Sequence, residues 1–427
     1  MRFPSAPHAL RSLRSPNFRR YYTGQAISQL GSWMQSVAIM WLAYRLTGST
    51  ASTGLVGFLG MAPYILVTPL AGTLSDRVSR RKVLIAVQAL LLLHASALTV
   101  ATYSGAITVP LLGLFAFLQG VLNGLEVPTR HAFFVQLIED KADLPNAIAL
   151  NSININGTRM IGPAIGGLLI ARVGEAACFG LNALSYLAVL VQLIRIKPNE
   201  GKKKLSPHSF AKDVLDGWRF ALTHPVIRAL LLMVGAVSFA ISPYTILMPA
   251  ISVETFGRGA ELNGLFLSAV GLGALTGAII FAMRPNVRGL SQWVTRTALI
   301  AACGVIGFAF SRNEWLSFIF MGMTGMGLMG TSVCVNTIIQ SIVDEDKRGR
   351  VVSIYSTFFI GAAPFSHLVS GWLAEHIGAP QTFLVCGIIC ALAALSYQLY
   401  QPRLRAHIRP HYEKQGIIPA TTTEGEK

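Results

Sequence analysis

The sequence predicts an all-α membrane protein with twelve transmembrane helices in two pseudo-symmetric six-helix bundles. Apolar runs of about 20 residues recur along the chain, and this length matches the roughly 30 Å hydrocarbon layer of a bilayer. Positive charge is concentrated between alternate runs, and the two halves of the chain resemble each other. Because the runs do not alternate apolar and polar residues, helices are expected rather than the strands of a barrel.

The composition agrees with this class. Of the 427 residues, 52% are hydrophobic and 13% are charged, about half the charged share of an ordinary soluble domain. The five cysteines lie in apolar runs with no metal-type histidine partner, so neither disulfides nor a metal site is expected. A nucleotide-binding loop and a nucleophile–base arrangement are both missing from the sequence, which argues against an enzyme and against a cofactor.

Basic residues orient the spans. With the N-terminus placed in the cytoplasm, 30 of the 35 Lys and Arg residues fall in segments on the cytoplasmic side and four on the other side. This positive-inside pattern places both termini in the cytoplasm and argues against a nucleic-acid footprint. The spans are expected at about 21–47, 53–74, 83–103, 107–127, 147–172, 175–195, 225–250, 260–283, 291–311, 314–338, 350–375 and 378–400.

The longest connection separates six spans from six. Within it, residues 213–222 have the pattern of a short amphipathic helix with Trp218 and Phe220 toward lipid, although an ordinary solvated linker is an equal alternative. The predicted division is an N-terminal bundle (1–195), a cytoplasmic linker (196–224), a C-terminal bundle (225–402) and a cytoplasmic tail that is expected to be disordered (403–427).

A weak internal repeat relates the two halves. At an offset of 204, Gly167 matches Gly371, and near an offset of 210 the segment Thr53-Gly-Leu matches Asn263-Gly-Leu. Parallel repeats of six spans are typical of transporters whose two bundles flank a central path.

The turn between the second and third spans is the most informative short segment. It reads Gly72-Thr-Leu-Ser-Asp-Arg-Val-Ser-Arg-Arg-Lys82 and resembles the signature loop G-x-L-x-D-R-x-x-R-R-[KR] of the major facilitator superfamily. The resemblance implies that Asp76 bonds to a neighbouring helix end and latches the outward-facing state. The alternative is that the cations only anchor the loop to anionic lipid. The residues that fit the signature are Gly72, Leu74, Asp76, Arg77, Arg80, Arg81 and Lys82.

Span 5 contains a second family-like run, Gly157-Thr-Arg-Met-Ile-Gly-Pro-Ala-Ile-Gly-Gly167. It resembles the G-x-x-x-G-P-x-x-G-G run of exporters, except that the upstream glycine, Gly157, lies one place early. Gly162, Gly166 and Gly167 permit close helix contact, and Pro163 is expected to kink the helix. The alternative is a seam of small residues with no bearing on transport direction.

Charged and titratable residues within the spans are candidates for coupling. Arg159 lies deep in span 5, where an unpaired cation costs roughly 3 kcal/mol or more. Its expected partners are Glu126 and the backbone carbonyls freed by Pro163. Glu126 and Arg130 have i,i+4 spacing and are also expected to pair. The roles left open are contact with a substrate anion, a proton relay, or a structural pair. His367 is a further proton candidate, although such a histidine is more often satisfied locally.

Polar and aromatic side chains in the spans are candidates for a substrate path. In the fold that the resemblance implies, helix 1 lines the central cavity, and its polar residues recur at helical spacing. Interhelical hydrogen bonding is the alternative. The candidates are Gln25, Gln29, Ser32, Trp33, Ser36, Gln119, Asn123, Asn151, Asn154, Tyr244, Asn336, Gln340 and Tyr355.

The family resemblance covers residues 18–400, and the segments 15–20, 31–35 and 41–48 are similar to a bacterial efflux branch that includes enterobactin-type siderophore exporters. It implies a monomeric inner-membrane transporter that exports an amphipathic or polar small molecule by alternating access. Proton antiport is the expected driving force, but no acid lies in the middle of span 1, which leaves the site of coupling open. Membrane lipid is the other expected partner. The alternatives are a lysophospholipid flippase, a nutrient importer and a non-transporting receptor or assembly module.

Overall fold

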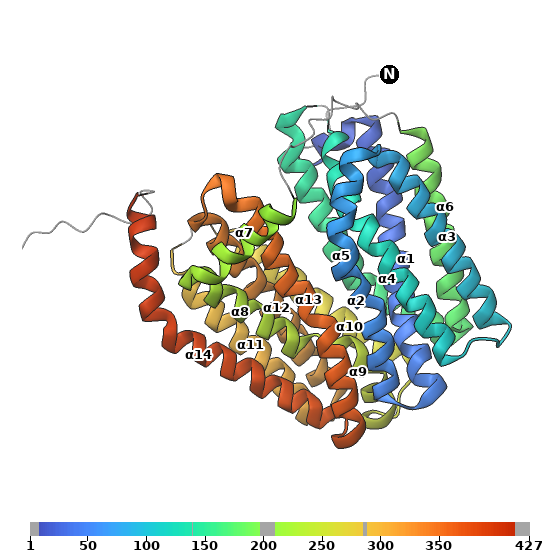
Figure 1. Cartoon of the computed structure of the whole chain (residues 1–427). Helices are drawn as coiled ribbons and strands as arrows, with labels where there is room; N and C mark the ends of the chain where they lie inside the picture. Colours follow the sequence, from blue (N-terminus) through green and yellow to red (C-terminus); the bar gives the residue numbers. More distant parts are fainter. Residues whose placement is uncertain (1–7, 139, 197–209, 285–287, 415–427) are drawn as a thin grey trace, which may run out of the picture. The chain divides into compact units, whose positions relative to one another are not determined.

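The computed structural model describes residues 8–138, 140–196, 210–284 and 288–414, and every regular element in these ranges is helical (Figure 1). The α-helices are α1 (Pro16–Thr47), α2 (Thr50–Arg77), α3 (Arg80–Tyr103), α4 (Val109–Gln136), α5 (Leu144–Val173), α6 (Glu175–Arg195), α7 (Phe210–Thr223), α8 (Pro225–Ile241), α9 (Tyr244–Ala250), α10 (Ala260–Ala282), α11 (Leu290–Phe310), α12 (Glu314–Ile342), α13 (Glu345–Ile377) and α14 (Ala379–Lys414). Short 3₁₀ turns, η1 (His8–Arg14) and η2 (Lys141–Asp143), precede α1 and α5, and a π turn, η3 (Ile251–Thr255), follows α9.

Ten spans in the described residues are long and apolar enough to cross a membrane. Helices α1 and α5, with 32 and 30 residues, are long enough but are not among the ten. Both carry a series of polar side chains, which lipid does not satisfy, and each packs on other helices of the protein. The number of twelve spans therefore stays a prediction.

One predicted span is divided in the structure. The expected span 225–250 consists of α8, a turn at Ser242-Pro243 and α9, and the π turn follows it. Proline has no backbone N–H and interrupts the helical hydrogen-bond ladder. Pro243 lies in the turn, and Pro249 lies just before the π turn.

The chain forms two compact units. The boundaries between them fall between Ser206 and Pro207, at the Ser242-Pro243 turn, within α10 and α13, and in the first turn of α14. Unit 1 comprises Met1–Ser206, Pro243–Gly271 and His367–Pro380, and unit 2 comprises Pro207–Ser242, Leu272–Ser366 and Gln381–Lys427.

In unit 1, α2 lies beside α4, and α6 lies beside both α1 and α3 (Figure 1). Helix α1 begins at Pro16 behind the N-cap Ser15, which suits the fixed φ of proline, and it ends at Gly48, whose φ of 61° favours glycine. The buried rings of Phe18 and Phe134 meet edge to face, with centroids 5.7 Å apart, so α1 is held to the end of α4.

In unit 2, α11 and α12 pack closely because glycine removes the side chain between them. A Cβ added at Gly327 would collide with the backbone of α11.

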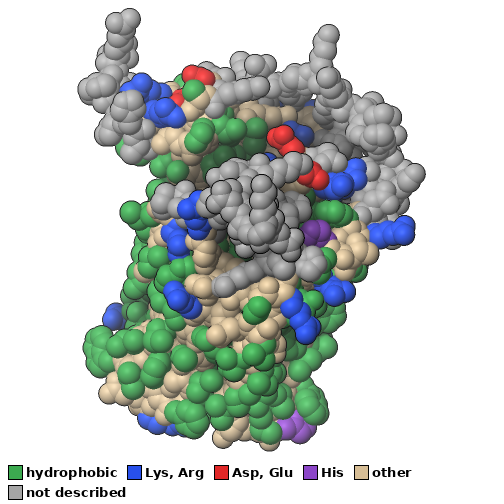
Figure 2. Space-filling view, turned by 90° about the vertical axis from the view of Figure 1, so that its left-hand side faces the viewer, with side chains coloured by type: hydrophobic (Ala, Val, Ile, Leu, Met, Phe, Trp, Pro, Cys, Tyr) green, Lys and Arg blue, Asp and Glu red, His purple; other side chains and the backbone are tan. Residues whose placement is uncertain are grey.

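Away from this core, α14 presents apolar side chains to the surroundings. Hydrophobic side chains dominate the lower part of the face drawn in Figure 2, where Lys and Arg are sparse. The exposed apolar residues of α14 are Ile388, Ile389, Leu392, Leu395 and Leu399.

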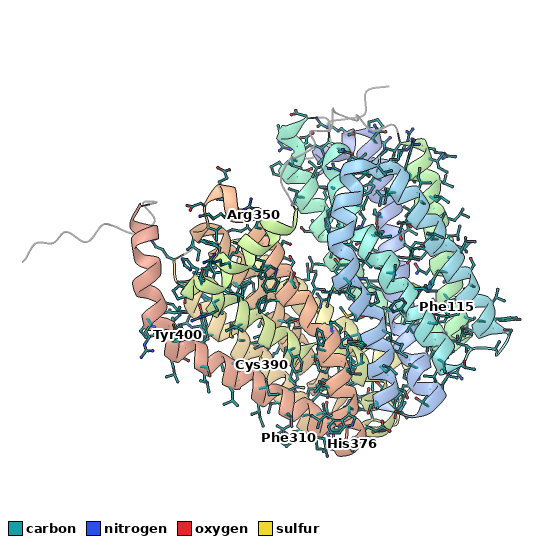
Figure 3. The ribbon with its side chains drawn as sticks, viewed as in Figure 1. Phe115, Phe310, Arg350, His376, Cys390 and Tyr400 are labelled. Atoms are coloured by element: carbon teal, nitrogen blue, oxygen red, sulfur yellow. The ribbon has the colours of Figure 1, made fainter. Side chains whose placement is uncertain are left out.

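The amphipathic helix predicted in the linker exists as α7, but its aromatic side chains contact protein. The ring of Trp218 lies 5.9 Å from that of Phe358 on α13, and Lys347 Nζ lies 4.9 Å from the centroid of the Phe220 ring. Gly217 packs against Arg350, which is labelled near α7 in Figure 3. These contacts dock α7 on α13, so the two aromatic residues do not simply face lipid.

The last helix is longer than expected. The predicted span ends near residue 400, whereas α14 continues to Lys414. Residues 403–414, which were expected to be disordered, are therefore helical. Residues 415–427 lie outside the described residues.

Candidate functional site

A buried ion pair lies on α4 of unit 1. Arg130 Nε is 2.9 Å from Glu126 Oε1, and the two side chains are only 11% and 10% exposed. Gln88 on α3 also donates to Glu126 Oε1, at 3.5 Å. The predicted i,i+4 pair is thus confirmed, and it forms a charged contact inside the helix bundle.

Arg159 is bound differently from the prediction. Its guanidinium donates to the hydroxyl of Tyr244 on α9 at 3.0 Å and lies 5.8 Å from the Trp33 ring centroid on α1. Arg159 forms no ion pair with any acidic residue that the structure describes, and Glu126 is paired with Arg130. The expected Arg159–Glu126 pair is therefore wrong.

The three residues Trp33, Arg159 and Tyr244 form what we call the aromatic–arginine site. The sequence analysis named all three but did not bring them together, because they come from α1, α5 and α9. Arg159 is half-buried. A cation held by a phenol and an indole keeps guanidinium N–H groups for an anionic or hydrogen-bond-accepting group.

The remaining polar face of α1 is partly used between helices. Thr158 on α5 donates to Gln29 at 3.5 Å, and Ser32 lies 3.4 Å from the hydroxyl of Tyr186 on α6. Gln25 is buried, and Ser36 is exposed. Interhelical hydrogen bonding, the alternative stated above, thus describes Ser32 and Gln29.

The other cavity candidates are scattered through the two units. In unit 2, Tyr355 makes a short hydrogen bond to Ser332 on α12, at 2.5 Å, so its hydroxyl is already engaged. Asn336 is half-buried and Gln340 is exposed. In unit 1, Asn154 is buried, and Gln119, Asn123 and Asn151 are half-buried.

The glycine run of α5 packs against α1. A Cβ at Gly162 would lie 2.5 Å from Trp33 Cβ, and one at Gly166 would lie 3.1 Å from Met34 Cα. Gly157, the glycine that departs from the family pattern, has no heavy atom within 4 Å of such a Cβ. Helix α5 continues through Pro163 from Leu144 to Val173.

Two glycine crossings join distant segments of unit 1. Gly167 on α5 meets Gly264 on α10, where an added Cβ would lie 2.9 Å from the partner Cα, and Gly54 on α2 meets Gly371 on α13 at the same 2.9 Å. The internal repeat relates the two pairs, because Gly167 corresponds to Gly371 and Gly54 to Gly264. Equivalent helices therefore cross in equivalent ways.

His367 lies beside the second crossing. Its Nε2 is 3.1 Å from the hydroxyl of Thr245 on α9, and a Cβ at Gly57 would lie 2.9 Å from its Nδ1. On α3, Nε2 of His94 lies 2.8 Å from the carbonyl oxygen of Phe115, which is labelled in Figure 3. Both rings have local partners, as the alternative to a proton role expects.

The signature turn between α2 and α3 ties three helices together. Arg80 donates to the carbonyl of Ala132 on α4 at 3.2 Å. Arg81 donates to the carbonyls of Leu193 and Ile194 at the end of α6, at 2.8 and 2.6 Å. Lys82 is exposed. The side chains of residues 72–77, including Asp76 and Arg77, lie outside the described residues, so the latch stays a prediction.

Sequence analysis missed a carboxylate that caps α2. Glu375 on α13 accepts hydrogen bonds from Ser49 Oγ at 3.0 Å and from Thr50 Oγ1 and the Ala51 N–H at 3.1 Å each. Nearby turns carry two further acid contacts, Arg45 to Glu175 at 2.6 Å and Tyr44 to Glu254. The sequence does place Glu375, Glu175 and Glu254 near connections that are predicted on the side opposite the cytoplasm. The positive-inside pattern depends on Lys and Arg alone, so it gives no role to these acids.

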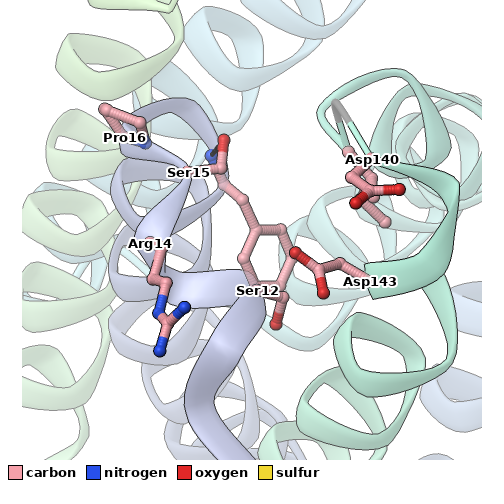
Figure 4. Close-up of a pocket in the computed structure, with 8 residues that line it drawn as sticks. Ser12, Arg14, Ser15, Pro16, Asp140 and Asp143 are labelled. Atoms are coloured by element: carbon pink, nitrogen blue, oxygen red, sulfur yellow. Dashed lines mark hydrogen bonds between the residues drawn. The ribbon is translucent and has the colours of Figure 1, made fainter. Parts of the chain in front are cut away.

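A cavity of about 240 Å³ opens where η1, α1 and η2 meet in unit 1 (Figure 4). Ser12 donates to Asn146 at 2.7 Å, and Arg11 pairs with Asp143 at 3.0 Å beside it. None of the predicted site residues lines this cavity. Its lining is Ser12, Arg14, Ser15, Pro16, Phe18, Ile138, Asp140 and Asp143. Among the described residues, no group of three His, Cys, Asp or Glu side chains is placed to hold a metal ion.

Solved structures share this fold. The chain is similar to a POT family transporter in complex with 5-aminolevulinic acid, with a TM-score of 0.75 and 13% identity over 91% of this chain and 97% of that one. It is also similar to a bacterial homologue of the human lysosomal transporter Spinster, with a TM-score of 0.72 and 14% identity over 93% and 97%. The fold and its membrane-length helices define the class as a multi-pass helical membrane protein.

Sequence relatives narrow the class. The chain matches a family of MFS proteins described as transmembrane secretion effector over residues 7–416. It is 24% identical to the staphyloferrin A transporter of Staphylococcus aureus over 90% of this chain and 96% of that protein. It is 23% identical to macrolide efflux protein A of Streptococcus pyogenes over 87% and 93%. The chain belongs to this secretion effector family of the major facilitator superfamily and is an efflux transporter, not an enzyme.

Proposed function

We propose that the protein exports a small polar or amphipathic molecule, siderophore-like or drug-like, across a bacterial inner membrane in exchange for protons. The relatives named above include a staphyloferrin A transporter, a macrolide efflux protein and the multidrug efflux pump Tap of Mycolicibacterium fortuitum. At 23–24% identity they support this range of cargo without selecting one compound from it.

The aromatic–arginine site carries the proposal on substrate chemistry. Arg159 lies in the middle of α5 and is held by Tyr244 and Trp33, with no carboxylate partner among the described residues. A guanidinium binds a carboxylate or phosphate through two parallel hydrogen bonds, and the neighbouring rings stack on apolar parts of a ligand. The site suits a molecule that combines an anionic group with an apolar or aromatic portion.

Alternating access is the proposed mechanism. The two glycine crossings hold α2 to α13 and α5 to α10 near the turns that we expect outside, and Glu375 ties α13 to the start of α2. These contacts support a state in which the outer end of the path is closed. Asp76 is proposed to latch the opposite state, and both termini are proposed to lie in the cytoplasm.

Proton coupling is proposed at the Glu126–Arg130 pair. It is a buried carboxylate–guanidinium contact within the helices of unit 1, with Gln88 beside the carboxylate. Protonation of Glu126 would release Arg130 from its partner and change the packing of α4 against α3.

A variant of Arg159 tests the substrate site. In inverted membrane vesicles, we expect Arg159→Gln to lower transport of anionic substrates by about tenfold or more, because a charge-assisted contact is lost, and to spare neutral ones. The matched control is Arg172→Gln, an exposed arginine on the same helix. Equal transport of anionic compounds by both variants would rule out the assignment.

Two further experiments test direction and latch. Metabolite profiling of a deletion strain should show the cargo retained inside cells and depleted outside, whereas depletion inside the cells would indicate an importer. For the latch, Asp76→Asn should fold and yet transport poorly. Unimpaired transport by folded Asp76→Asn would mean that Asp76 latches nothing.

A further inference from the structure

The turn between α10 and α11 is cationic and lacks acids. It carries Arg284 and Arg288, and Arg296 follows in the first turns of α11. No Asp or Glu occurs in the sequence between Glu261 and Glu314. The turn occupies the same place in the second half as the signature turn does in the first, but it has no counterpart of Asp76.

Two of these arginines lie over a single aromatic ring. The guanidinium carbon is 5.4 Å from the Trp293 ring centroid for Arg284 and 5.1 Å for Arg296. Phe281 supports the indole edge-on, with centroids 5.5 Å apart. Each cation–π contact is favourable, but two guanidinium groups beside one ring repel each other.

Among the residues that the structure describes, no carboxylate neutralises this pair of arginines. Within the described residues, neither Arg284 nor Arg296 forms an ion pair with a carboxylate. Arg284 makes a long hydrogen bond, 3.4 Å, to the carbonyl oxygen of Arg288. Arg296 is exposed, and Arg284 is half-buried. An anion that binds beside these guanidinium groups would offset their positive charge.

The surroundings indicate which anion fits. The turn joins two candidate membrane spans, Ala260–Ala282 and Leu290–Phe310, so it lies at the depth of lipid headgroups. Tryptophan and arginine favour this interface, where an apolar body meets a polar layer. Ile279 and Ile280 in the last turn of α10 and Met283 directly after it are exposed, at 49%, 47% and 78%, where acyl chains would lie.

We propose that this turn, formed by Arg284, Arg288, Trp293 and Arg296, is a binding site for the phosphate headgroup of an anionic phospholipid. The phosphate accepts hydrogen bonds from the guanidinium groups, the indole packs on the glycerol region, and the acyl chains run along the exposed apolar residues of α10. Free inorganic phosphate would satisfy the arginines but would leave the apolar surface unused.

Lipid retention by the full-length protein tests the site. We compare Arg284→Gln/Arg296→Gln with Arg19→Gln/Arg20→Gln, which removes the same charge from exposed positions of α1 expected on the same side of the membrane. Native mass spectrometry measures bound phosphatidylglycerol and phosphatidylcholine. The first variant should bind phosphatidylglycerol about thirtyfold more weakly, because charge-assisted hydrogen bonds to the phosphate are lost, and the control should change much less. Equal losses in both variants would overturn the proposal, because affinity would then follow net charge alone.

Trp293 provides a second readout. Phosphatidylglycerol with brominated acyl chains should quench part of the tryptophan fluorescence, and this quenching should saturate. It should be absent in the Trp293→Phe variant, and brominated phosphatidylcholine should not produce it. Millimolar inorganic phosphate should fail to reverse this quenching. Full reversal by phosphate would show an ion site rather than a lipid site, and identical quenching by both lipids would refute headgroup recognition.

Discussion

The two cationic turns of this transporter occupy equivalent places in the repeat and have different partners. At the first turn, Arg80 and Arg81 at the start of α3 donate to backbone carbonyls of α4 and α6. At the second, Arg284 before α11 and Arg296 within α11 lie over the ring of Trp293. The arginines of the first turn therefore bind other helices of the protein. Those of the second turn contact an aromatic ring and keep N–H groups for a group outside the protein.

The difference shows why charge alone does not define a role. A guanidinium beside the end of a helix satisfies carbonyls that have no partner within that helix, and the helix dipole favours a cation there. Trp293 provides no acceptor oxygen, so its arginines keep most of their hydrogen-bonding capacity. We expect the first turn to contribute to stability and the second to respond to the membrane.

The glycine crossings differ from the cationic turns in this respect, because the two repeat-related crossings have nearly the same geometry. An added Cβ would lie 2.9 Å from the partner Cα in either direction for Gly167 and Gly264, and 2.9 or 2.7 Å for Gly54 and Gly371. Close backbone contact tolerates little variation, since any side chain at the crossing separates the helices. Three predictions test these likenesses and differences between the halves.

The largest effect is expected at the crossings. A Cβ at Gly264 would collide with the carbonyl oxygen of Pro163, so Gly264→Leu should cost about 3 kcal/mol of unfolding free energy and abolish transport. Gly371→Leu should behave in the same way. Thermal unfolding in detergent and vesicle transport measure both. Gly157→Leu, with no neighbour within 4 Å, is the control, and an equal loss there would mean that the crossings are not special.

A smaller effect is expected at the ion pair that only the first half possesses. At the offset of 204, Gly330 and Cys334 stand where Glu126 and Arg130 do. Glu126→Gln leaves a buried arginine without its charge partner and should destabilise the protein by about 3 kcal/mol or somewhat less. The double variant Glu126→Gln/Arg130→Gln should recover most of this loss in thermal unfolding.

Transport by the same variants separates a relay from a structural pair. A relay requires Glu126 itself, so the stable double variant should remain inactive. Full transport by the double variant would show that the pair is only structural and would leave the site of proton coupling elsewhere.

The smallest effect separates the two turns directly. Arg81→Gln should lower the free energy of unfolding by about 2 kcal/mol, because hydrogen bonds from a charged donor to the end of α6 are lost. Arg284→Gln removes the same charge and should change stability by no more than about 0.5 kcal/mol. If thermal unfolding shows the same loss of stability for Arg81→Gln and Arg284→Gln, the two turns do not differ in their contribution to stability.

Local patterns predicted part of the site correctly. The i,i+4 spacing of Glu126 and Arg130 on one helix is sufficient to pair them. The linker helix α7 also followed from its amphipathic pattern. The partner of Arg159 was predicted wrongly, because the nearest acid along adjacent helices was preferred to a tyrosine 85 positions away. Glu375 was missed because its partners belong to the start of α2.

The sequence alone determined the helical membrane class, the superfamily and the positions related by the repeat. These follow from hydrocarbon thickness, hydropathy and short motifs, which are local properties of the chain. Only the tertiary structure decided which repeat-related glycines meet, which carbonyls Arg81 binds and which residues surround Arg159. Such contacts join residues far apart in the chain, and their geometry depends on how whole helices cross, which no local pattern specifies.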